Sequence, residues 1–209
     1  MPDTSASLYE QLFPLTTVMK QRVVDNFSGD SVNERWTELN VSSTPTYGMV
    51  DGVDGGAFIK TNTTNNCQGK FTFNNIRQYE PTGAVCISVW KTLQTTSVDM
   101  AAGIMKDGTV GNEDALSRAF TTVSANYVLS TGDASTESHT ASSVAIDTNY
   151  HSHKVECGSV NVKHTIDGVL ETTKTTNRPT FRLQPIVQAR TLTTAIREIN
   201  ITYIEAYNT

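Results

Sequence analysis

Residues that branch at Cβ dominate this chain, and they limit the folds open to it. The 209 residues include 32 Thr, 19 Val and 11 Ile but only 10 Leu. Branched side chains have few χ1 rotamers and pack well on a pleated sheet, whereas leucine favours helices. The 13 Gly and 15 Asn recur at short intervals, as residues of tight turns do. The composition therefore predicts a mostly β protein made of many short strands.

Several of these strands are marked by alternating apolar and polar residues. The predicted strands lie at 85–90, 154–157, 159–167, 169–173 and 199–206. Asp167-Gly168, between two of them, is the strongest short signal for a hairpin turn. The last segment has apolar residues on both faces, so we expect it to be covered on both sides. Many short strands in series predict an all-β, two-sheet antiparallel sandwich.

The first 21 residues form a predicted N-terminal arm ahead of one domain that spans 22–209. Leucines recur there at helical spacing, Ser7-Leu8-Tyr9-Glu10 has the form of a capping box, and Pro14 interrupts the pattern. The arm is too apolar for a solvated tail, which leaves two places for it to dock. It packs on an identical subunit or a viral shell, or it folds back over the edge of its own sheet. The candidate intersubunit residues are Leu8, Leu12, Phe13, Leu15 and Met19.

Charge and cysteine usage argue against several classes of function. The 16 Lys and Arg stand against 21 Asp and Glu, a formal net charge of −5, whereas nucleic-acid binding needs a cationic surface. No apolar run approaches the roughly 18 residues of a membrane helix, and the start lacks the apolar stretch of a signal peptide. The three cysteines, Cys67, Cys86 and Cys157, are an odd set without CxxC spacing. We expect reduced thiols, no nucleic-acid or membrane partner, and no secretion by a signal peptide.

Three segments resemble the concanavalin A-like, laminin-G-like jelly rolls. Asp25-Asn26-Phe27-Ser28-Gly29-Asp30, followed by Arg35-Trp36, resembles their opening turn, and His164-Thr165-Ile166-Asp167-Gly168-Val169-Leu170 their late hairpin. Ile201-Thr202-Tyr203-Ile204-Glu205-Ala206-Tyr207 resembles their closing strand, with Thr202 where members often carry Asp. The resemblance implies a jelly roll over residues 22–209, with Phe27 and Trp36 in the core and Asp30 in a turn. The short polar start, Val53-Asp54-Gly55-Gly56 and Thr191-Leu192-Thr193-Thr194 are similar to segments of jelly-roll proteins from tailed phages.

The residues of a glucanase active site are not found as a local motif. Glucanases of this fold place Glu-x-Asp-x-x-Glu on one strand, so that all three side chains face the concave side. The chain contains no such run, although a carboxylate pair assembled from different strands stays open. We therefore expect no catalytic residues.

Two segments could begin a metal site. His151 and His153 share one face of a predicted strand, and His164 could join them from the next strand. No Asp or Cys at ligand spacing completes that set. The loop Asp51-Gly52-Val53-Asp54 could bind Ca²⁺, but turn formation explains it more simply. We expect neither a metal ion nor another cofactor.

These observations lead to three hypotheses of function. The leading one is a non-enzymatic structural protein of a phage virion, a head decoration or tail-associated jelly roll. It would assemble in the host cytoplasm with other virion proteins or identical subunits. The alternative is a lectin-like carbohydrate-binding module for surface glycans, and the third is a glucanase-like glycoside hydrolase. Candidate glycan-stacking residues, which could equally pack between the sheets, are Trp90, Tyr79, Tyr127 and Tyr150.

Overall fold

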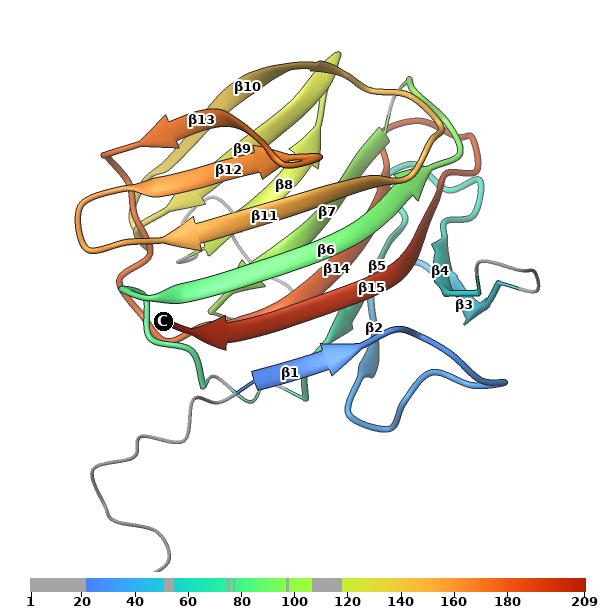
Figure 1. Ribbon diagram of the computed structural model, residues 1–209. Helices are drawn as coiled ribbons and strands as arrows, with labels where there is room; N and C mark the ends of the chain where they lie inside the picture. The colour runs from blue at the N-terminus through green and yellow to red at the C-terminus, as the bar shows by residue number, and fades with distance from the viewer. Residues whose placement is uncertain (1–21, 51–54, 75, 77, 97, 107–117) are drawn as a thin grey trace, which may run out of the picture.

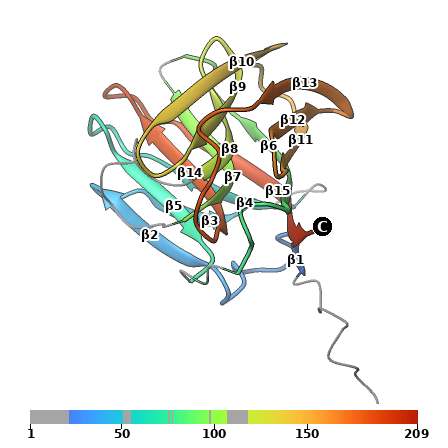
Figure 2. The ribbon, with the colours of Figure 1, turned by 90° about the vertical axis from the view of Figure 1, so that its left-hand side faces the viewer.

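The computed structural model shows two antiparallel β-sheets packed face to face (Figure 1). It describes residues 22–50, 55–74, 76, 78–96, 98–106 and 118–209. The predicted arm and the Asp51–Asp54 loop lie outside the described residues, as does most of the stretch 113–120, which the sequence leaves open as a helix or a loop. Figure 2 shows the sandwich from the side, with one sheet in each layer.

The larger sheet has eight strands in the order β13-β12-β11-β6-β15-β4-β3, and β1 also pairs with β15. Its strands are β1 (Arg22–Asp25), β3 (Thr46–Met49), β4 (Ala57–Lys60), β6 (Ala84–Thr92), β11 (His151–Cys157), β12 (Val162–Ile166), β13 (Val169–Lys174) and β15 (Glu198–Asn208). The predicted hairpin is confirmed: Asp167 and Gly168 join β12 to β13 with φ values of 49° and 83°. Positive φ at both positions is what a type I′ turn requires.

The smaller sheet has seven strands in the order β10-β9-β8-β7-β14-β5-β2. Its strands are β2 (Thr37–Ser42), β5 (Gln68–Thr72), β7 (Val98–Met105), β8 (Arg118–Val123), β9 (Asn126–Gly132), β10 (Glu137–Ala145) and β14 (Gln184–Thr191). The described residues contain no helix, so none of them forms a helix long and apolar enough to cross a membrane.

The closing strand β15 differs in one detail from what its sequence pattern predicts. Strict alternation would place Ile199 and Ile201 on one face and Ile204 and Ala206 on the other. A β-bulge between Ile201 and Tyr203 shifts the register, so that all four side chains lie in the core. A bulge inserts one extra residue and reverses the faces beyond it. The apolar side chains of the strand therefore share the core face. The other face is covered in part as well, because Asn200 and Glu205 there are only 6% and 7% exposed.

One side of the sandwich is closed by side chains that join the edge strands of the two sheets. Oε2 of Glu171 on β13 accepts hydrogen bonds from the backbone N and Oγ of Ser143 on β10, at 2.9 and 2.6 Å. Lys174 contacts Ser138 across the same gap. An unpaired edge strand is a template for aggregation, and these contacts hold β10 and β13 beside each other instead.

Candidate functional site: a groove on the seven-stranded sheet

The seven-stranded sheet turns one face to the core and the other away from it. On β7, Met100, Ala102 and Ile104 belong to the core cluster. Because successive side chains of a strand point to opposite faces, Asp99 and Ala101 belong to the outward face. The register places Asp99 opposite Arg190 of β14, and Ala101 opposite Thr122 of β8. The outward face therefore carries polar and charged side chains from several strands.

A groove of about 680 Å³ lies on this face, across β7 to β10 near the β8–β9 turn. Its lining combines carboxylate, imidazole, amide and hydroxyl groups with aliphatic side chains. The lining residues are Asp99, Thr122, Val123, Ser124, Ala125, Asn126, Val128, His139, Ala141 and Leu192. Small-ligand sites are typically concave and have a few polar groups set among apolar ones. The groove is therefore the candidate site.

Asp99 forms part of one wall of the groove, and side chains of neighbouring strands hold it in place. Oγ1 of Thr122 donates to Oδ1 of Asp99 at 3.3 Å, and Nη1 of Arg190 lies 3.7 Å from its Oδ2. Arg190 also donates from Nη2 to Oδ1 of Asn66 at 3.0 Å. This ion pair fixes a negative and a positive group side by side at the β7–β14 boundary.

The opposite wall is formed by β10, where Glu137 and His139 point to the same face. Glu137 Oε1 is contacted by Arg118 and by Nε2 of His139, and it accepts a hydrogen bond from Oγ of Ser130 at 3.1 Å. The side chains of Arg118 and Glu137 are 5% and 10% exposed, whereas that of His139 is 56% exposed. A carboxylate that is mostly covered and is paired with Arg118 therefore holds an imidazole that is open to the groove.

The carboxylates of this face do not form the pair that a glycosidase uses. Among the described residues of β7 to β10, they are Asp99 and Glu137 alone. Three strand spacings separate β7 from β10, about 14 Å across the sheet. Glycosidase carboxyl groups are separated by about 5 to 9.5 Å. These two carboxylates therefore cannot act together on one bond.

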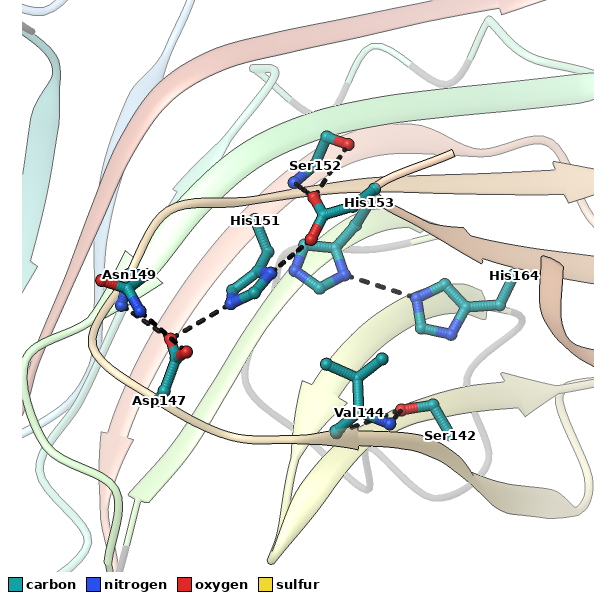
Figure 3. Close-up of polar contacts among 9 residues, drawn as sticks. Ser142, Val144, Asp147, Asn149, His151, Ser152, His153 and His164 are labelled. Carbon is teal, nitrogen blue, oxygen red and sulfur yellow. Dashed lines mark hydrogen bonds and ion pairs between the residues drawn. The ribbon is translucent and has the colours of Figure 1, made fainter. Parts of the chain in front are cut away.

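A second polar cluster lies at the start of β11 and is drawn in Figure 3. His151 is bridged by two carboxylates: its Nδ1 lies 2.6 Å from Oδ2 of Asp167, and its Nε2 3.1 Å from Oδ1 of Asp147. Burial opposes a charge on the ring, but the hydrogen bonds from Asp167 and Asp147 prevail and raise the pKa of His151. The imidazole joins the β10–β11 loop to the β12–β13 turn. Its role is structural, since both ring nitrogens are occupied.

His153 and His164 lie deeper, between the sheets. Nε2 of His164 is 2.9 Å from Oγ1 of Thr121 and 3.4 Å from Nδ1 of His153, whose ring stacks on Trp90 at a centroid distance of 4.8 Å. Burial lowers the pKa of His164 to about 4 and that of His153 well below its ordinary value, and the His164 and His151 rings add to the second effect. Both rings are therefore neutral at pH 7. No group of three metal-ligating side chains occurs among the residues that the structure describes.

Three of the four predicted glycan-stacking residues lie in the core and not on the surface. Trp90, Tyr79 and Tyr127 are each 0% exposed, so the expectation that they stack on a glycan is wrong for these three. They occupy the space between the sheets, which large aromatic side chains fill well. Tyr150 is half-buried, with Nζ of Lys91 4.4 Å from its ring centroid, and its role stays a prediction. The arm residues Leu8, Leu12, Phe13, Leu15 and Met19 lie outside the described residues.

The cysteines are free and buried. Burial raises the pKa of the Cys157 thiol to about 12, and burial, with a smaller effect from the neighbouring Cys157, also raises the pKa of Cys86. A protonated buried thiol is a poor nucleophile. Cys86 and Cys157 therefore pack as small apolar side chains.

Sequence reasoning missed Asp99, Arg118, Glu137 and His139. Glu137 and His139 have one visible signal, two ionisable residues two positions apart on a strand, which places them on one face. Asp99 and Arg118 carry no such signal. Their partners in the site lie on other strands, so no local sequence pattern identifies them.

No protein-family model and no curated protein sequence matches the chain. Solved structures do match it. A protein of unknown function from Shewanella oneidensis has a TM-score of 0.67 and 14% identity, over 100% of this chain and 95% of that one. Bacillus licheniformis β-glucanase has a TM-score of 0.65 and 10% identity, over 90% of this chain and 98% of that one. The carbohydrate recognition domain of Emp47p has a TM-score of 0.61 and 10% identity, over 90% and 94%.

These neighbours correct the leading hypothesis of function. They are mainly carbohydrate-active enzymes, and they also include an endo-β-galactosidase from Clostridium perfringens and the Crh5 transglycosylase. The expectation of a non-enzymatic phage structural protein is therefore wrong, and no named neighbour supports a phage link. It was based in part on the missing one-strand motif, which excludes only one way to build a site. At these identities the likeness concerns the fold: the chain is a concanavalin A-like jelly-roll sandwich.

Proposed function

We propose that this protein acts on a polysaccharide, which it binds in the groove of the seven-stranded sheet and cleaves at a glycosidic bond. The observation that carries the proposal is the groove itself, about 680 Å³ on the outward face of β7 to β10. Its Asp99, Asn126 and Thr122 side chains suit sugar hydroxyls, and Val128 and Leu192 suit the apolar C–H faces of a sugar ring. A polysaccharide can extend along such an open surface.

The structural neighbours support the same class of substrate. Their names include a β-glucanase, an endo-β-galactosidase and a transglycosylase, and all of these proteins share the sandwich. A fold hosts many functions, so the groove residues of this chain have to supply the chemistry.

The test is the release of reducing ends from mixed-linkage β-glucan, galactan and chitin oligosaccharides. We expect the wild-type protein to release reducing ends from at least one of them. Asp99→Ala should lower that release about tenfold or more, because it removes a hydrogen-bonding group from the groove. Asp30→Ala, an exposed residue before β2, is the matched control and should leave release unchanged. No release and no binding with any of the three polysaccharides would refute the proposal.

A second candidate is glycan binding without cleavage. The separation of Asp99 and Glu137 favours it, and so does the carbohydrate recognition domain of Emp47p among the neighbours. Isothermal titration with the same polysaccharides distinguishes the two functions. Binding that Asp99→Ala weakens, without release of reducing ends, would select this second function.

A further inference from the structure

The groove contains one histidine that is open to a ligand. His139 and Glu137 lie opposite Ser130 and Gly132 of β9 in the strand register, which places both on the groove face of β10. The His139 side chain is 56% exposed, whereas that of His151 is 14% exposed and His153 and His164 are buried. Among the four histidines, His139 is therefore the one that a bound glycan can reach.

The carboxylate of Glu137 orients the His139 ring, and buried neighbours hold that carboxylate in place. Arg118, Ser130 and His139 all contact Oε1 of Glu137, and the first two are buried. The contact uses Nε2 of His139, so Nε2 carries a proton and Nδ1 is the nitrogen left for a ligand. A carboxylate that holds one imidazole nitrogen sets the tautomer and the orientation of the ring.

We propose that His139 is the proton donor for glycosidic bond cleavage and that Glu137 is its positioning residue. This inference rests on the proposed function and names the acid of the same groove. Nδ1–H of the imidazolium gives its proton to the glycosidic oxygen while the bond from that oxygen to the anomeric carbon breaks. The electron pair of that bond stays on the oxygen, which becomes a hydroxyl group. Water then adds to the anomeric carbon, and the proton that it loses returns to Nδ1.

Three variants test the assignment with whichever of the three polysaccharides the wild-type protein cleaves. His139→Gln keeps a polar side chain but has no titrating proton, so kcat should fall about a hundredfold or more, the usual worth of a general acid, with KM changed less than about threefold. Glu137→Gln should reduce kcat less, about tenfold. His151→Gln removes a carboxylate-paired imidazole outside the groove and should leave kcat unchanged.

A measurement without substrate keeps the assignment testable if Glu137→Gln does not fold. Nitrogen-15 NMR of the wild-type imidazoles, assigned with His139→Gln, should show neutral His139 with its proton on Nε2. A proton on Nδ1 instead would overturn the inference. Cleavage by His139→Gln at the wild-type rate would also overturn it while the proposed function stands. Release from none of the polysaccharides would refute the cleavage function itself, and with it the proton donor.

Discussion

Nε1 of Trp36 donates a hydrogen bond to Oδ2 of Asp25 at 2.8 Å. The other oxygen of the same carboxylate accepts the backbone N–H of Phe27 at 2.7 Å, and the rings of Phe27 and Trp36 lie 5.6 Å apart. Asp25 therefore anchors the turn after β1 to the aromatic core. The expectation that Phe27 and Trp36 are core residues is confirmed, with 2% and 5% of each exposed.

Removal of the Trp36 ring should destabilise the domain strongly. Trp36→Ala empties a buried aromatic site and leaves Asp25 without its indole partner, so we expect a loss of about 3–5 kcal/mol in unfolding free energy. Urea denaturation measures it. Trp36→Phe is the control, because it keeps a ring in the core and should cost less. A loss below about 1 kcal/mol for Trp36→Ala would contradict this packing.

Gly56 permits a close backbone approach that no other residue allows. Its φ is +118°, and a Cβ at this position would lie 2.6 Å from the carbonyl oxygen of Ile201 on β15. Gly29 has a similar φ of +116° but open space around it. Both alanine substitutions should cost backbone strain of about 1–3 kcal/mol, and Gly56→Ala adds the collision. Thermal melts should show Gly56→Ala to be the less stable, and equal stabilities would contradict the close approach.

The buried His164 should make the domain sensitive to acid. The pKa of His164 is about 4 in the folded domain and 6.5 in the unfolded chain. Between these pH values the unfolded chain binds a proton at His164 and the folded domain does not. Stability should therefore decrease as pH falls from 6.5 to about 4, by about 3 kcal/mol for this group. Urea unfolding at pH 7 and pH 4 measures the difference. His164→Gln should reduce the difference, whereas the exposed His139→Gln should retain it, and equal pH dependence in both variants would contradict the prediction.

His151 should have the opposite effect on the pH dependence of stability. Its pKa is raised in the folded state, so the stability that it contributes is fully present below pH 6.5 and is lost as pH rises through the folded pKa. His151→Gln should therefore cost more stability at pH 5 than at pH 9. Chemical denaturation at the two pH values tests this, with wild-type protein as the reference. An equal cost at both values would mean that the ion pairs with Asp147 and Asp167 add nothing to stability.

The sequence by itself determined the fold class and several local features. The excess of Thr, Val and Ile predicts strands because branched side chains suit a pleated surface. Asp167-Gly168 predicts its turn because these residues accept positive φ at low cost. Each of these properties belongs to a few neighbouring residues, and no distant contact is needed to state it.

Only the tertiary structure decided which side chains meet. The bulge in β15 moves Ile204 and Ala206 onto the core face, and no local pattern announces it. The groove joins Asp99 to Asn126 and His139, which come from three different strands. Arg118 reaches Glu137 through the β8–β9–β10 register. Alternation specifies only the face of a strand, whereas strand order and register specify the partners across it, and these depend on the packing of the whole sandwich.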